Sequence, residues 1–170
     1  ISNIVFAEPT KGKWGIKIRK LLSEGRKGIS PEEELEWFIN DRKEDVEINI
    51  QPALNAGKVV LMDRYYFSTA AYQGALGFDP QKIKGDNENF APHPDRVLIF
   101  HNSPEKSLER IESAREEKSA FERSDYLMNV QKIFKSFTGS RIRFISSDAT
   151  LEEVHEQVLL EVQDLFDRKL

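Results

Sequence analysis

The sequence predicts an α/β fold in which a parallel β-sheet carries helices on both faces. Short apolar runs alternate with longer segments of helical periodicity along the whole chain. That alternation is typical of strand-helix-strand units, whose crossover helices make neighbouring strands run parallel. No internal repeat, low-complexity tract or interdomain linker interrupts the pattern. We therefore expect residues 1–170 to form a single domain.

The first half of the chain carries clear signals for strands and helices. Residues 59–62 are a short apolar run after Gly57, which favours a buried strand covered on both faces. Ser30 and Pro31, followed by Glu32 and Glu33, are typical of a helix start with a cap, a proline at the first position and acidic residues in the first turn. We expect strands at residues 3–7 and 58–63, and helices at 13–24, from 30 towards Leu54, and at 66–76.

The second half repeats the alternation after an irregular stretch. Residues 77–94 are rich in Pro, Gly, Asn and Asp, so we expect a long loop that wraps the substrate side. We expect strands at residues 96–101 and 141–146, and helices at 104–117, 122–137 and 150–168.

Composition limits the classes of function. The chain of 170 residues is 39% hydrophobic, which is enough apolar surface for one core, and its net charge of −4 argues against general nucleic-acid binding. It contains no cysteine, which excludes disulfides, a catalytic thiol and cysteine metal sites. No apolar run approaches the roughly 20 residues that span a bilayer. We expect a cytoplasmic protein without a membrane partner.

A charged pair ends the predicted strand at 58–63. In open α/β sheets ligands bind at the carboxyl ends of the strands, so Asp63 and Arg64 are candidate site residues. Asp63 would orient a metal-bound water, and Arg64 would hold a phosphate with its planar fork. The alternative is a surface ion pair without function.

The residues after this pair resemble the signature of the thymidylate kinase (dTMP kinase) family, which reads here as DRYYFSTAAYQG. The resemblance extends to four further segments and so covers nearly the whole chain. These segments are EPT with GIKIRKLL, FINDR, NENFAPHPDRVLIF and AFERSDYL. The resemblance implies a nucleotide kinase with the fold of the P-loop NTPases.

One part of that family's pattern is missing. The sequence has no GxxxxGK[ST], and Gly12-Lys13 is followed by Trp14, which has no hydroxyl for Mg²⁺. By resemblance, the P-loop lies ahead of the EPT segment, so we expect the first strand and the P-loop to precede Ile1. That strand would lie at the sheet centre, between the strands that end at Asp63 and near His101. A diverged protein without ATP chemistry is the alternative.

The resemblance assigns the base and sugar contacts. Phe38 and Arg42 are four residues apart on a predicted helix and so share one face. Phe38 would stack on thymine, and Arg42 would donate to a thymine carbonyl. From spacing alone, a core Phe beside a surface Arg fits as well. Tyr72 would pack near the sugar, where a 2′-hydroxyl would crowd it.

Further polar groups accompany these residues. Ser68, Thr69 and Gln73 would hydrogen-bond the base edge or cap the helix. Glu8 resembles the acid of the family's EP turn near the acceptor phosphate and the metal region, and a plain turn is the alternative.

The resemblance also places a lid near residues 113–122 and an ATP-side loop after the last strand. Arg115 would contact ATP and the transferring phosphoryl group. The family often has Arg just before Phe121, and Ala120 stands here instead, so Arg123, Lys118 or an arginine in the absent P-loop could replace it. Asp148 lies in a segment that resembles the family's loop under the adenine of ATP. The three scattered histidines form no metal pattern.

Together these features predict a kinase that moves the γ-phosphoryl of Mg-ATP to dTMP, giving dTDP and ADP. ATP and Mg²⁺ are the expected cofactors, and the resemblance implies a homodimer. Two alternatives stay open. One is a kinase for another deoxynucleotide or a deoxynucleoside, for which Glu8 would be the base. The other is a non-catalytic nucleotide-binding homologue.

Overall fold

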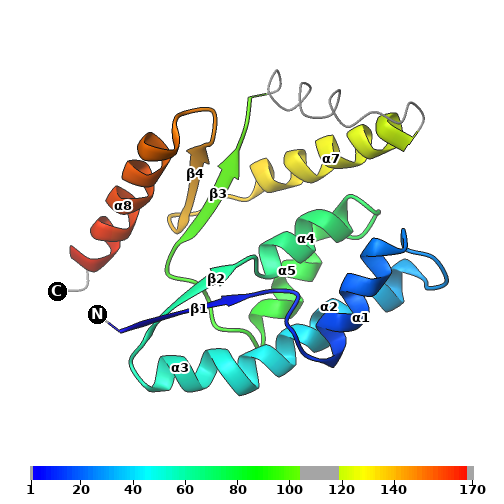
Figure 1. Ribbon diagram of the computed structural model, residues 1–170, viewed down its shortest axis with the longest axis horizontal. Helices are drawn as coiled ribbons and strands as arrows, with labels where there is room; N and C mark the ends of the chain where they lie inside the picture. Colours follow the sequence, from blue (N-terminus) through cyan, green and yellow to red (C-terminus); the bar gives the residue numbers. More distant parts are fainter. Residues whose placement is uncertain (1, 104–118, 168–170) are drawn as a thin grey trace. The chain divides into compact units, whose positions relative to one another are not determined.

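The structure is a computed structural model that describes residues 2–103 and 119–167 (Figure 1). The chain divides into two compact units, Ile1–His93 and Pro94–Leu170. We describe each unit by itself, and the expectation of a single domain stays a prediction. Parallel strands alternate with helices in both units, which confirms the α/β fold expected from the sequence.

The first unit contains a pair of parallel strands and a set of helices. Its elements are β1 (Asn3–Ala7), α1 (Lys13–Ser23), α2 (Pro31–Asp45), the π-helical η1 (Val46–Ile50), α3 (Gln51–Asn55), β2 (Val59–Asp63), α4 (Tyr66–Gly74) and α5 (Pro80–Glu88). The strands and the first helices therefore lie within a few residues of their expected bounds.

β1 and β2 pair in parallel from Asn3 opposite Val59 to Ala7 opposite Asp63. Val5 and Leu61 are directly opposite each other and are 64% and 47% exposed. The sequence predicted that both faces of β2 are buried, and the exposed Leu61 corrects this prediction. The described residues leave the face that carries Val5 and Leu61 accessible. The register brings the carboxyl ends of both strands to one edge, where ligands collect in such folds.

The long helix starts and widens for local reasons. The Ser30 hydroxyl accepts a hydrogen bond from the Glu33 amide at 3.2 Å, and Pro31 occupies the first turn, as the sequence predicts. Pro52 has no N–H to donate and its ring would crowd the carbonyl four residues earlier. The helix widens into η1 just before it, where the Gln51 amide donates to Val46.

α5 corrects the sequence prediction for residues 77–94. The expected loop contains a helix of nine residues, which begins where the Asp79 carboxylate accepts hydrogen bonds from the amides of Gln81 and Lys82. Asp followed by Pro is a helix start signal. The Gly and Asn content of the segment favours a loop, and the prediction therefore missed the helix. α5 packs against α4 and brings Asn87 into the interior.

Gly15 allows α1 to approach the turn after β1. A Cβ at this position would lie 1.9 Å from the carbonyl oxygen of Thr10. The turn itself is fixed, because the Thr10 amide and hydroxyl donate to the Asp41 carboxylate at 2.7 and 2.6 Å. The guanidinium of Arg19 on α1 also donates to the carbonyls of Pro9 and Thr10. A residue without a side chain is therefore required where α1 crosses this turn.

The second unit contains β3 (Val97–His101), α7 (Ser119–Ser136), β4 (Ile142–Ser146) and α8 (Leu151–Asp167). β3 and β4 pair in parallel, and α8 lies alongside β4 (Figure 1). Arg96 holds α8 through Asp164 at 2.7 Å and Glu161 at 3.5 Å. The helix expected at 104–117 lies outside the described residues.

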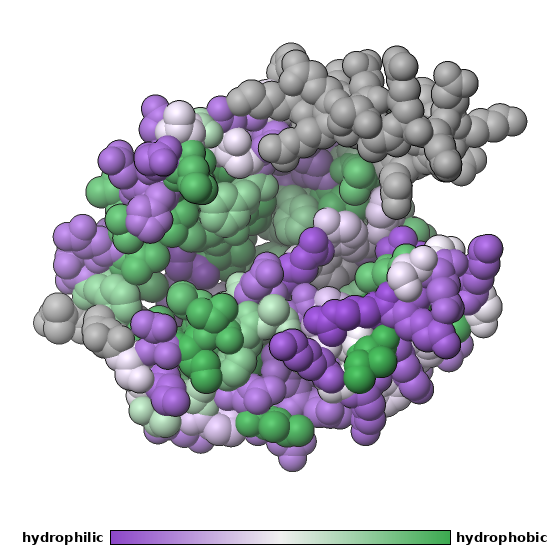
Figure 2. Space-filling view, viewed as in Figure 1, coloured by the Kyte–Doolittle hydropathy of each residue, from purple (hydrophilic) through white to green (hydrophobic). Residues whose placement is uncertain are grey.

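The visible surface over α1 and α2 is largely hydrophilic, with isolated apolar side chains (Figure 2). The interior of the first unit contains Ile18, Tyr66, Ala70, Ala71 and Ile83. Within the described ranges, no helix is both long and apolar enough to cross a bilayer.

Candidate functional site

Two predicted site residues follow the paired strands at the same edge. Glu8 comes directly after β1, and its amide donates to the Asp63 carbonyl at 3.1 Å. Arg64 comes directly after β2 and has φ of 67°, in the left-handed region that non-glycine residues rarely adopt. Its guanidinium carbon lies 5.3 Å from the ring centroid of Tyr72 on α4. Such backbone conformations concentrate at ligand sites, so this edge is a candidate site.

Arg42 is the centre of a buried polar cluster, which we call the arginine cluster and which contains Glu8, Arg42, Thr69 and Asn87. Arg42 is only 1% exposed. Its Nη1 donates to Asn87 at 2.7 Å, and its Nη2 donates to Thr69 at 3.0 Å and to the Glu8 carboxylate. Asn87 is held in turn, because its Nδ2 donates to the Ile83 carbonyl at 2.8 Å. The cluster joins the turn after β1 to α2, α4 and α5.

Burial controls the electrostatics of this cluster. Removal from water raises the pKa of Glu8 to about 7, although the nearby Arg42 guanidinium and its hydrogen bond act in the opposite direction. Burial also raises the pKa of Asp45, although the Asn49 side chain donates to its carboxylate. Burial raises the pKa of the Tyr65 phenol as well. The ring centroid of Tyr65 lies 5.3 Å from the guanidinium carbon of Arg42.

The arginine cluster keeps unused hydrogen-bonding capacity. A guanidinium has five N–H donors, and three are used here. The buried Nε of Arg42 and the buried Oε1 of Glu8 have no hydrogen-bond partner in the described part of the chain. Such groups are costly unless a ligand or water satisfies them, so these two atoms mark places where a polar partner would stabilise the cluster.

A second buried polar group links α2 to α4. The Nε2 of Gln73 donates to Glu34 at 2.8 Å, and the Nε of Arg26 approaches both Glu34 oxygens at 3.1 and 3.0 Å. Gln73 is fully buried, and its Oε1 has no partner among the described residues. Oε1 of Gln73 is therefore a buried acceptor that a water or a ligand would have to satisfy.

Phe38 lies between these two groups along α2. Glu34, Phe38 and Arg42 are spaced four residues apart and therefore lie along one face of the helix. Thr69 and Gln73 are likewise four residues apart on α4, and each contacts this face of α2. An aromatic side chain flanked by an arginine and an amide can hold a flat polar ring.

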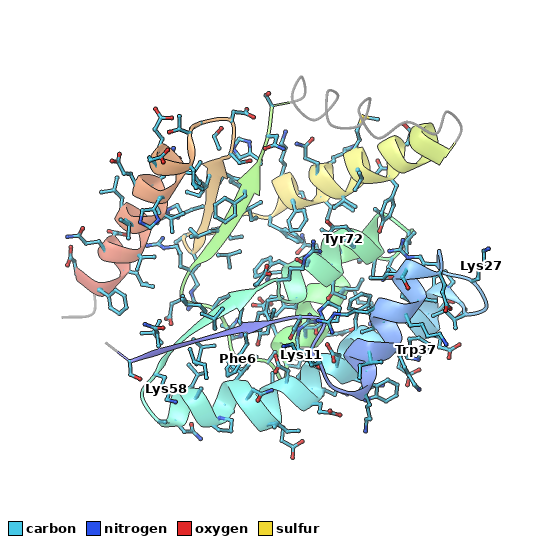
Figure 3. The ribbon with its side chains drawn as sticks, viewed as in Figure 1. Phe6, Lys11, Lys27, Trp37, Lys58 and Tyr72 are labelled. Carbon is cyan, nitrogen blue, oxygen red and sulfur yellow. The ribbon has the colours of Figure 1, made fainter. Side chains whose placement is uncertain are left out.

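The remaining predicted residues have different surroundings. Ser68 and Tyr72 are half-buried on α4, and Figure 3 labels Tyr72 there. Asp63 is exposed at the end of β2. The Asp148 carboxylate, in the second unit, accepts from the Ser103 amide at 2.7 Å. Arg115 and most of the expected lid lie outside the described residues.

The described residues contain no group of three or more metal-ligating side chains. The exposed Asp63 carboxylate is a single hard oxygen donor. Mg²⁺ keeps several waters and is bound by one or two carboxylates together with substrate phosphates. The residues present therefore fit Mg²⁺ bound mainly by water and substrate.

Sequence reasoning missed Glu34, Asn87 and Tyr65. Glu34 lies four residues before Phe38, so its place on the same face could have been read from the spacing. Asn87 lay in the stretch expected to be a loop. Tyr65 follows Arg64 directly, and only the tertiary structure brings its ring to Arg42.

Comparison with known proteins gives consistent matches over most of the chain. The thymidylate kinase family model matches residues 1–158. Thymidylate kinase of Desulfotalea psychrophila is 45% identical over 163 residues, which cover 95% of this chain and 80% of that relative. Thymidylate kinase of Akkermansia muciniphila is 44% identical over 151 residues, covering 89% and 72%. The crystal structure of thymidylate kinase from Ehrlichia chaffeensis has a TM-score of 0.71 at 24% identity, and the match covers 95% of this chain and 81% of that one. This likeness supports the expected fold.

Proposed function

This chain belongs to the thymidylate kinase family, and we propose that it transfers the γ-phosphoryl group of ATP to the 5′-phosphate of dTMP, giving dTDP and ADP. The assignment of the site rests on two buried polar groups, one at Arg42 and one at Glu34 and Gln73. Arg42 and Glu34 each lie about one helical turn from Phe38 on α2. The family supports the reaction, and the local chemistry supports the base and phosphate contacts.

Thymine presents a donor, N3–H, between two carbonyl acceptors. Among the described residues neither the Nε of Arg42 nor the Oε1 of Gln73 has a partner, so Nε is a donor for a carbonyl and Oε1 is an acceptor for N3–H. Phe38 would stack on the ring between them. Ser68 and Thr69 supply hydroxyl groups along the same helix.

The acceptor phosphate would lie at the edge formed by the ends of β1 and β2. Arg64 holds phosphate oxygens there with its guanidinium, which carries its charge at any working pH. Tyr72 lies beside this guanidinium, so the residue that would pack against the sugar is next to the residue that would hold the phosphate. Glu8 keeps Arg42 in place through a buried ion pair.

Phosphoryl transfer needs alignment and charge neutralisation more than covalent chemistry. Bound Mg²⁺ neutralises charge on the transferring phosphoryl group, and Asp63 would hold it through water. The acceptor phosphate is already a nucleophile, so this reaction needs no general base. Arg115 and Asp148 as contacts to ATP, the homodimer and the cytoplasmic location remain predictions from the sequence.

The test is conversion of dTMP by the full-length natural protein with Mg-ATP, with both products separated by chromatography. We expect dTDP and ADP in equal amounts. Phe38→Ala should raise KM for dTMP on the order of tenfold or more, because a stacked base is worth roughly 1–3 kcal/mol. Trp37→Ala is the matched control, since Trp37 is next to Phe38 on α2 and its ring contacts Lys17.

Two outcomes would contradict the proposal. ATP-dependent phosphorylation of thymidine without conversion of dTMP would indicate a nucleoside kinase, and Glu8→Gln would then abolish activity. Binding of dTMP without turnover in the full-length natural protein would indicate a non-catalytic homologue.

A further inference from the structure

Glu34 and Gln73 are buried and form a group with the half-exposed Arg26, and the proposed reaction has no direct use for the two charged residues of this group. Glu34 is only 2% exposed, although it carries a carboxylate. Burying a charge is costly unless it is paired and hydrogen-bonded. Both Glu34 oxygens are paired here with Arg26, which comes from the turn after α1 and has φ of 58°. The structure therefore keeps a costly arrangement next to the amide of Gln73.

A glutamine amide has two orientations that differ little in shape but are opposite in hydrogen bonding. One end is a carbonyl acceptor and the other end donates two N–H groups. A carboxylate only accepts, so Glu34 selects the orientation in which Nε2 faces it, as the 2.8 Å contact requires. Oε1 is then turned away from Glu34 and remains a buried acceptor without a protein partner in the described ranges.

We propose that Glu34 is a positioning residue that sets the base selectivity of the enzyme by fixing the orientation of the Gln73 amide. Arg26 supports this role because its Nε pairs with both oxygens of the Glu34 carboxylate. The inference rests on the proposed function, because it assumes that Oε1 of Gln73 accepts from N3–H of thymine.

The selectivity follows from the difference between thymine and cytosine. Thymine carries a proton at N3, whereas N3 of cytosine is an acceptor and its donor is the exocyclic amino group. With the sugar and phosphate held, the two donors occupy different positions. A fixed carbonyl at N3 therefore pairs with thymine and leaves an acceptor facing an acceptor with cytosine. A freely turning amide would satisfy either base.

The experiment compares dissociation constants of dTMP and dCMP, measured by titration calorimetry, for the full-length natural protein and its Glu34→Gln variant. A glutamine at position 34 has nearly the same shape but presents either a carbonyl or an NH₂ to Gln73. We expect the dTMP preference to fall on the order of tenfold, through weaker dTMP binding, stronger dCMP binding or both. Glu36→Gln, an exposed carboxylate on the same helix, is the matched control and should leave the preference unchanged.

A second variant keeps the test decisive if Glu34→Gln does not fold. Arg26→Met leaves Glu34 in place but removes its ion pair, and should lower the preference by a smaller factor. A purely structural role predicts lower thermal stability with both ligands weakened equally, and this result would overturn the inference. An unchanged preference in a folded Glu34→Gln variant would do the same, because a water would then be the partner of Oε1. Absence of dTMP binding in the wild type would instead overturn the proposed function and this inference with it.

Discussion

Replacement of Arg42 by Met should destabilise the first unit in a pH-dependent way. The variant keeps a side chain of similar length in the buried position but removes the hydrogen bonds that Arg42 donates to Glu8, Thr69 and Asn87. All three acceptors are buried, so water cannot replace the guanidinium without opening the structure.

The magnitude follows from the state of each acceptor. Thr69 and Asn87 each lose a hydrogen bond, which costs about 1 kcal/mol or more apiece. Glu8 can limit its own cost by taking up a proton. Because its pKa is about 7 in the wild type, protonation at pH 8 costs about 1.4 kcal/mol, and this part nearly disappears at pH 6. We expect a total loss of about 3–4 kcal/mol at pH 8 and about 2 kcal/mol at pH 6.

Urea denaturation at the two pH values measures both numbers. The control is the Glu8→Gln variant, alone and combined with Arg42→Met, since an amide in place of the carboxylate has no proton to take up. The double-mutant cycle should show coupling at pH 8 that shrinks at pH 6. A loss below about 1 kcal/mol, or a loss equal at both pH values, would refute the reasoning.

Three further predictions concern single residues. Gly15→Ala should cost about 1–3 kcal/mol in urea denaturation, because its Cβ would lie 1.9 Å from the Thr10 carbonyl oxygen, and a cost near zero would mean that the turn moves freely. The raised pKa of Glu8 means that the folded state binds the proton more tightly than the unfolded state. Stability should therefore fall by up to about 3 kcal/mol as the pH rises from 4.5 to 7, and Glu8→Gln should remove this fall. Asp63→Asn should raise the Mg²⁺ concentration needed for half-maximal rate on the order of tenfold, while KM for dTMP in excess Mg²⁺ stays within about twofold.

The elements with local signals were predictable from the sequence. Ser30 and Pro31 start α2 because a cap and a first-turn proline act within a few residues, and both are seen. The short apolar runs predicted all four described strands, because this signal also lies within a few residues of the chain. Asp79 and Pro80 carry the same kind of signal, yet the surrounding composition favoured a loop, and α5 was missed.

The site was predictable only in part, because tertiary contacts determine its chemistry. The spacing of Phe38 and Arg42 correctly predicts a shared helix face, but spacing alone allowed Arg42 to lie on the surface, and it is buried. The partners of Arg42 come from the turn after β1, from α4 and from α5, and Asn87 lies 45 residues away in the chain. The pairing of Glu34 with Gln73 likewise joins two helices that the sequence does not show to be neighbours.

Transfer of labelled phosphate tests the central claim most directly. The full-length natural protein is incubated with dTMP, Mg²⁺ and ATP labelled in its γ-phosphoryl group, and the position of the label is followed by phosphorus NMR. The account predicts that the label appears in the β-phosphate of dTDP. Label found only in ATP, or only in inorganic phosphate, would contradict it.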